Sequence, residues 1–144
     1  MSTLELVRVG LVRDDKAQDQ KPITSPAEAL EHLTEIAQSD REQFVSIHLD
    51  TRHNPLGMEV VSVGSLSASI VHPREVFKAA ILNNASSMLL AHNHPSGDPT
   101  PSRDDIEITK RLIRAGELMG IDILDHLIVA PVTKWLSMRE LGVI

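Results

Sequence analysis

The segment Ser87 to Ala91 (SMLLA) is short and almost continuously apolar, a pattern typical of an interior β-strand whose two faces are both covered. A helix that opens at Pro73 and stops near Asn83 precedes it. A second helix begins at Ser102, carries an apolar stripe and ends at Gly120. A buried strand between two amphipathic helices predicts an α/β fold.

Apolar patterning predicts further elements on both sides of this unit. A capping box with proline at the first helical position predicts a helix from Pro26 to about Gln38, and the polar segment Arg13 to Lys21 predicts a loop. A short helical tail is expected from Ser137. The expected strands are Leu4 to Val12, Phe44 to Leu49, Met58 to Val63, a continuation of the sheet over Gly64 to Ile70, Ile121 to Val129 and Val132 to Leu136. These elements predict a mixed β-sheet flanked by helices in a single domain, in which residues 1–22 form an N-terminal strand and polar loop and residues 23–144 form the main body.

Composition excludes several classes of function. The chain has no cysteine, which excludes disulfides, a thiol nucleophile, iron–sulfur clusters and zinc sites with cysteine ligands. With 14 Lys and Arg against 20 Asp and Glu, the formal charge of −6 disfavours direct DNA binding, which depends on neutralising phosphates. We see no membrane span or secretory leader and expect a soluble, cytoplasmic protein.

The segment Ala91 to Asp105 (AHNHPSGDPTPSRDD) carries the residues suited to chemistry. His92 and His94 follow the interior strand, and alternate residues of an extended chain project to the same side. Asp105 lies in the first turn of the next helix. Two imidazoles and one carboxylate form the ligand set of a catalytic zinc site with one position left for water, and Fe(II) can use the same set.

Each of these residues also has a purely structural interpretation. A His-x-His pair is often coincidental or a matter of sheet packing. Asp105 taken alone is explained as the capping-box partner of Ser102, stabilised by the helix dipole. A metal-dependent hydrolase needs a general base in addition, and the two best-placed candidates are Glu42, at the start of the Phe44 strand, and Glu59, on the following strand.

The spacing His-x-His, seven residues, Ser-x-x-Asp matches the JAMM (MPN-plus) metalloprotease motif at His92, His94, Ser102 and Asp105. The stretch from Val71 to Thr109 resembles the RadC family of bacterial proteins, as do REQFVSIHLDT upstream and GIDILDHLIV downstream. Full-length members carry an N-terminal helix-hairpin-helix region, so this chain resembles a shorter branch that has the JAMM domain only.

The resemblance implies a JAMM/MPN fold of the cytidine-deaminase-like type, with Zn²⁺ bound by His92, His94 and Asp105. It implies that Ser102 helps to hold the oxyanion of a tetrahedral intermediate and that Glu42 is the general base, with Glu59 in reserve. Asp125 and His126 also match the family, and we expect them to form structural hydrogen bonds rather than to bind metal.

Two functions follow as hypotheses. The first is a zinc metallohydrolase, a peptidase or isopeptidase acting on a protein or peptide, in which Glu42 takes a proton from the attacking water. The second is a non-catalytic adaptor associated with DNA repair. A nucleobase deaminase is excluded because such sites use cysteine ligands. The sequence names neither the substrate nor the oligomeric state.

Overall fold

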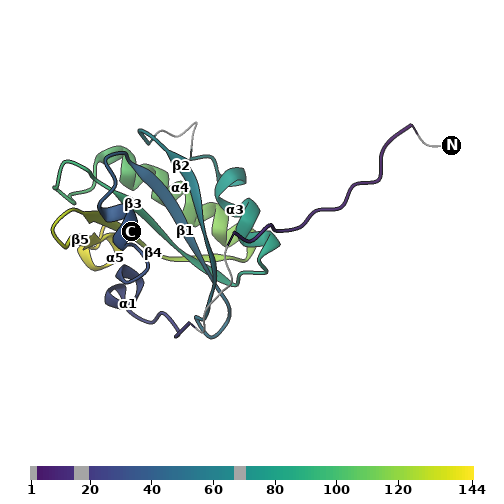
Figure 1. The fold of residues 1–144 in the computed structure, drawn as a ribbon, viewed down its shortest axis with the longest axis horizontal. Coiled ribbons are helices and arrows are strands. Elements are labelled where there is room, and N and C mark those ends of the chain that lie inside the picture. Colours follow the sequence, from purple (N-terminus) through teal and green to yellow (C-terminus); the bar gives the residue numbers. More distant parts are fainter. Residues whose placement is uncertain (1–2, 15–19, 67–70) are drawn as a thin grey trace.

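The computed structural model describes residues 3–14, 20–66 and 71–144. Its centre is a five-stranded sheet in the order β2-β1-β3-β4-β5 (Figure 1). The strands are β1 (Gln43–Leu49), β2 (Pro55–Val63), β3 (Ser87–Asn93), β4 (Asp122–Ala130) and β5 (Lys134–Ser137). Strand β3 runs parallel to β4, and the other neighbours are antiparallel, which confirms the predicted α/β fold with a mixed sheet.

The apolar segment at Ser87 forms the middle of the sheet, as the sequence predicts. Every residue of β3 is buried, and so are all residues of β1 after Gln43. Central strands need cover on both faces, and this explains why β3 shows no polar alternation until it reaches His92 and Asn93.

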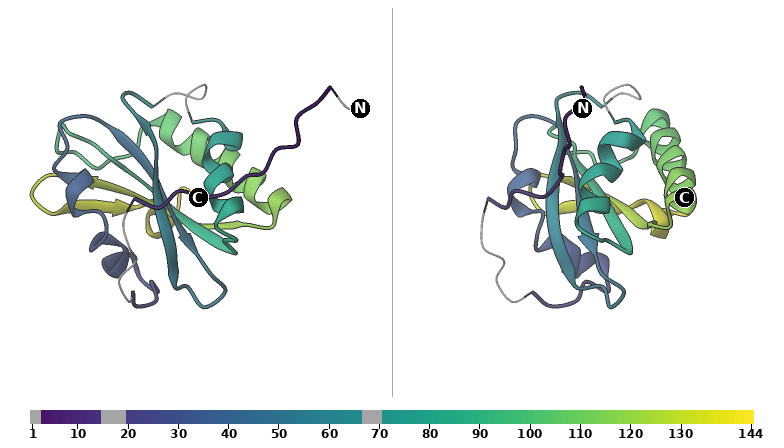
Figure 2. Two further views of the ribbon diagram at one scale, coloured as in Figure 1. Left: turned by 45° about the vertical axis from the view of Figure 1, so that its right-hand side comes forward. Right: turned by 90° about the vertical axis from the view of Figure 1, so that its right-hand side faces the viewer.

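Helices cover both faces of the sheet (Figure 2). Helices α3 (Pro73–Leu82) and α4 (Arg103–Met119) pack on one face, in a core that includes Phe44, Phe77 and Leu112. Helices α1 (Pro26–Leu30) and α2 (Thr34–Ala37) pack on the other face, around residues such as Val45 and Leu127. The last helix, α5 (Met138–Leu141), follows β5 directly.

The predicted strand over Leu4 to Val12 is wrong. Residues 3–14 contain no strand and lead away from the body of the molecule in Figure 1, with Leu6 92% and Val9 81% exposed. Apolar alternation produces a strand only where a neighbouring strand pairs with the backbone and one face of the strand is buried. Residues 3–14 meet neither condition, since no strand pairs with them and all of them are exposed. Of the predicted loop Arg13 to Lys21, residues 15–19 lie outside the described residues.

Two other boundaries differ from the sequence prediction. The helix expected from Pro26 to Gln38 is divided into α1 and α2, because the backbone at Leu33 leaves the helical region (φ −112°, ψ 7°). Leu33 and Ile36 are both buried in the core on this face of the sheet. Strand β2 ends at Val63 and residues 64–66 add no strand, while residues 67–70 of the predicted continuation lie outside the described part of the chain.

Among the described residues, no helix combines the length and the apolar character required to cross a bilayer.

Candidate metal centre

The end of β3 brings two histidines together. His92 is the penultimate residue of β3, and His94 follows the strand with its amide held by the Val129 carbonyl at 2.9 Å. Strand alternation places both rings on the same side, as predicted, and their Nε2 atoms are 2.9 Å apart. His92 is fully buried, whereas the side chain of His94 is 13% exposed, so the pair faces solvent on the His94 side only.

The first turn of α4 adds a carboxylate to this pair. Asp105 Oδ2 lies 3.5 Å from His92 Nε2 and 3.3 Å from His94 Nε2. The same oxygen accepts the backbone N–H of Ser102 at 2.9 Å, and Ser102 Oγ accepts the N–H of Asp105 at 3.0 Å. The predicted capping box and the predicted convergence on the histidines therefore coexist in one side chain.

The geometry of these three residues fits a small divalent cation. Tetrahedral zinc with bonds of about 2.0–2.1 Å to nitrogen and oxygen separates its ligand atoms by roughly 3.3 Å. The observed separations of 2.9, 3.3 and 3.5 Å lie close to that value. Among the described residues, His92, His94 and Asp105 form a group whose ligand atoms lie close enough together that they could hold a metal ion.

Electrostatics at the site favour an ionised carboxylate. Burial raises the pKa of Asp105, but its bonds to His92 and His94 lower that pKa more, so the net pKa lies well below the usual range. The bond to Asp105 raises the pKa of His94, burial opposes the shift, and the charge of Glu42 adds to it. A negative charge between two imidazoles is the arrangement that attracts a cation.

Neighbouring groups fix the orientation of both rings. His94 Nδ1 lies 2.8 Å from the carbonyl oxygen of Asp98, so this nitrogen donates its proton, and in the neutral ring Nε2 then carries the lone pair. His92 Nδ1 lies 2.6 Å from His126 Nε2. Phe44 stacks on His92 with ring centroids 6.4 Å apart and packs edge-on against His126 at 5.5 Å.

Glu42 lies immediately before β1, beside the open side of the site. Strand β1 pairs Phe44 with His92, so a residue two positions before Phe44 lies near His94. Hydrogen bonds hold the backbone on both sides of Glu42 in place. The amide of buried Asn93 donates to the Arg41 carbonyl at 2.9 Å and accepts the Gln43 N–H at 2.6 Å. The Glu42 carbonyl in turn accepts the N–H of Gly64 at 2.7 Å.

Glu59 lies elsewhere on the sheet. It is paired with Ser46 on the edge strand β2, two residues along β1 from the Phe44–His92 pair. Burial raises the pKa of Glu59, and the charges of Lys78 and Glu75 in α3 also act on it. Its electrostatic partners are therefore on α3 rather than at the histidine pair.

Sequence reasoning missed two buried residues that organise the site. Asn93 stands between the two histidines and, by the same alternation, projects to the opposite side, where it holds the segment that carries Glu42. Thr109, one helical turn after Asp105, contacts His126 at 2.6 Å. The i, i+4 spacing of Asp105 and Thr109 is the signal that places both on one face of α4.

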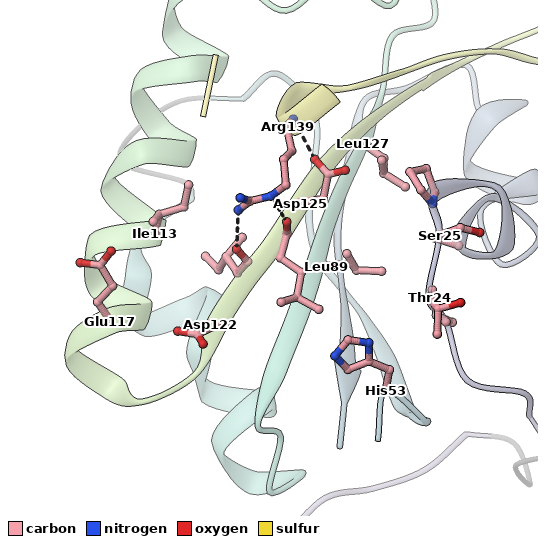
Figure 3. Close-up of a pocket in the computed structure, with 15 residues that line it drawn as sticks. Thr24, Ser25, His53, Leu89, Ile113, Glu117, Asp122, Asp125, Leu127 and Arg139 are labelled. Carbon is pink, nitrogen blue, oxygen red and sulfur yellow. Dashed lines mark hydrogen bonds between the residues drawn. The ribbon is translucent and has the colours of Figure 1, made fainter. Parts of the chain in front are cut away.

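Asp125 has the structural role that the sequence predicts. Its Oδ1 accepts the N–H groups of His126 and Arg139, and its Oδ2 accepts the Ser137 hydroxyl, so it joins β4 to the start of α5. Figure 3 shows Asp125 and Arg139 in the wall of a cavity of about 520 Å³ that none of the three candidate ligands lines. The Arg139 guanidinium donates hydrogen bonds to the carbonyl oxygens of Ile123 and Leu124 in β4.

Comparison with known families identifies the fold that carries this site. The profile of the RadC-like JAB domain matches residues 23–143. The chain belongs to this family. The JAB domain match therefore includes the candidate ligands, Ser102 and Glu42.

Curated relatives of this JAB domain are bacterial and archaeal proteins called UPF0758 protein. One from Desulforamulus reducens is 52% identical over 112 residues, covering 78% of this chain and 49% of the relative. One from Methanosarcina mazei is 44% identical over 126 residues, 87% of this chain and 55% of the relative. One from Geobacillus thermodenitrificans is 44% identical over 143 residues, 99% of this chain and 62% of the relative. The chain thus spans about half the length of the relatives that it matches, and their names state no activity.

Proposed function

We propose that this domain is a zinc-dependent hydrolase that cleaves an amide bond, as a peptidase or an isopeptidase. The observation that carries the proposal is the convergence of His92 Nε2, His94 Nε2 and Asp105 Oδ2 at separations of 2.9 to 3.5 Å. The neutral His94 ring has its Nε2 lone pair toward the centre, because its Nδ1 proton is donated to a backbone carbonyl. Such a set of two nitrogens and one carboxylate oxygen suits zinc and leaves a further position for the reactants.

Zinc supplies two effects when bound at such a site: it lowers the pKa of a water to about 7, and it polarises the carbonyl under attack. The residues around the site supply the remainder of the chemistry. Glu42 takes the proton of the attacking water and returns it to the leaving amine. Its position beside His94, whose pKa its charge raises, supports this role over Glu59, whose electrostatic partners lie on α3.

Ser102 is suited to stabilise the charge that develops on the carbonyl oxygen. Its hydroxyl oxygen accepts the Asp105 N–H, and no other bond that the structure gives for the described residues uses the hydroxyl proton. The side chain also stands at the N-terminus of a 17-residue helix, where the partial charge of the helix dipole is positive. A hydroxyl donor at the positive end of a helix is well placed to favour an oxyanion.

Zinc-loaded protein incubated with a proteome-derived peptide library tests the proposal, with new N-termini read by mass spectrometry. We expect cleavage by the wild type, loss of cleavage with retained zinc in Glu42→Gln, and cleavage by the matched variant Glu59→Gln. Loss of cleavage in Glu59→Gln but not in Glu42→Gln would overturn the assignment of the base. A zinc-loaded wild type that cleaves nothing would overturn the peptidase proposal and favour the non-catalytic adaptor.

A further inference from the structure

We propose that His126 and Thr109 form a buried relay that fixes the tautomer of His92 and so keeps its Nε2 lone pair directed at the metal centre. The inference rests on the proposed function, because it assigns positioning residues to the same site. The relay extends from the backbone of one candidate ligand, Asp105, to the ring of another, His92.

Three short hydrogen bonds connect these groups in sequence. Thr109 Oγ1 donates to the carbonyl oxygen of Asp105 at 2.7 Å and lies 2.6 Å from His126 Nδ1. His126 Nε2 lies 2.6 Å from His92 Nδ1. Thr109, His126 and His92 are all completely buried, so solvent does not compete for these bonds.

The positions of the protons follow from the first bond. A carbonyl oxygen can only accept, so the hydroxyl proton of Thr109 lies toward Asp105. The Thr109 oxygen must then accept from His126, which places a proton on His126 Nδ1. His126 is completely buried, and the hydrogen bonds given for its two ring nitrogens join them to Thr109 Oγ1 and His92 Nδ1 and to no carboxylate, so its surroundings favour the neutral ring, whose Nε2 then carries the lone pair.

The same reasoning carries over to the next ring. Because His126 Nε2 accepts, His92 Nδ1 must be the donor, and the neutral form of His92 then has its lone pair on Nε2. This is the atom that faces His94 and Asp105. Metal-binding histidines commonly have their other nitrogen held by an outer partner in this way, and loss of that partner lowers metal affinity.

The two histidines of the site are thus oriented by different means. His94 is partly exposed and donates to a backbone carbonyl of its own loop at 2.8 Å. His92 lies within a central strand, and it reaches the Asp105 carbonyl through two side chains. The relay therefore connects the first turn of α4 to β3 and fixes one ligand relative to the other.

The alternative is that the relay only fills the core with satisfied polar groups. A second buried pair in the same sheet serves as a control, since Ser46 Oγ contacts His48 Nε2 at 3.0 Å. This pair also joins a hydroxyl to an imidazole, and the hydrogen bonds that the structure gives for it involve Asn83 and none of the candidate ligands. The variant Ser46→Ala removes a similar bond without touching the metal centre.

The test uses Thr109→Val, which keeps the shape and removes the hydroxyl, and Thr109→Ser, which restores it. Histidine ¹⁵N NMR of the metal-free chain reads the tautomers, and competition with a chromophoric chelator reads zinc affinity. We expect His126 protonated at Nδ1 in the wild type, loss of that single tautomer in Thr109→Val, and zinc affinity lower by roughly 10–100-fold. Thr109→Ser should restore both readouts, and Ser46→Ala should leave both unchanged.

A wild-type His126 protonated at Nε2, or a folded Thr109→Val with wild-type tautomers and zinc affinity, would overturn the relay. If Thr109→Val does not fold, the protonated nitrogen of His126 in the wild type still decides the question. A wild type that binds no zinc would overturn the proposed hydrolase instead, while the tautomers of the metal-free chain would continue to test the relay.

Discussion

Asp105 combines two roles that a pair of variants can separate. Its Oδ2 accepts the Ser102 N–H at 2.9 Å as part of the α4 capping box, and the same atom faces His92 and His94 at 3.5 and 3.3 Å. Asp105→Asn keeps an oxygen that can accept the Ser102 N–H but removes the negative charge. Ser102→Ala removes the capping hydroxyl but leaves the carboxylate in place.

The two variants should change different quantities: Ser102→Ala should lower stability, and Asp105→Asn should lower zinc affinity. Ser102→Ala loses the bond from the Asp105 N–H, 3.0 Å long, and should lower the free energy of unfolding of the metal-free chain by about 1 kcal/mol. Its zinc affinity should stay near that of the wild type. Asp105→Asn loses an anionic ligand, so its zinc affinity should fall by more than the ~10–100-fold that loss of an outer-shell partner costs.

Urea unfolding followed by circular dichroism measures the first quantity, and chelator competition measures the second. If Asp105→Asn binds zinc as tightly as the wild type, the carboxylate is a helix cap only and the reasoning about the site fails. If Ser102→Ala loses zinc as Asp105→Asn does, the cap and the ligand cannot be treated as separate roles.

Two further predictions concern stability. Burial, and then the charge of Arg13, lower the pKa of His48 from 6.5 to about 4, so below pH 6.5 the unfolded chain binds a proton that the folded chain does not. Urea unfolding of the metal-free chain should show that its free energy of unfolding falls by ~2 kcal/mol between pH 7 and pH 5. The variant His48→Gln should lack this loss. An equal loss in His48→Gln would contradict the assignment of the pH dependence to His48. In Gly116→Ala, the new Cβ would lie 2.5 Å from the Ile121 carbonyl oxygen, so we expect a loss of roughly 1–3 kcal/mol despite the ~1 kcal/mol by which alanine favours a helix. A thermal melt that shows Gly116→Ala to be more stable than the wild type would contradict that packing.

The sequence predicts most of the sheet and the three candidate ligands because their signals are local. The apolar run of β3, the alternation of His92 and His94 and the Ser102 capping box each depend on residues close together in the chain. The JAMM spacing then joins these signals into one motif. The only contact between distant elements that this prediction required is the packing of the first turn of α4 against the end of β3.

The errors and omissions have long-range causes. Leu4 to Val12 has an acceptable strand pattern, but nothing in the sequence tells whether a sheet edge receives it. The relay joins His92 to a residue 34 positions later, and the Asn93 amide reaches the segment around Glu42, about 50 positions earlier. Such contacts depend on strand order and register, which local patterns do not specify.

Anomalous diffraction at the zinc edge from crystals of the zinc-loaded protein tests the central claim most directly. The expected result is a single strong peak within bonding distance of His92 Nε2, His94 Nε2 and Asp105 Oδ2, which disappears in His94→Ala. A fully loaded crystal with no peak between these three atoms would contradict the metal centre and the hydrolase proposed from it.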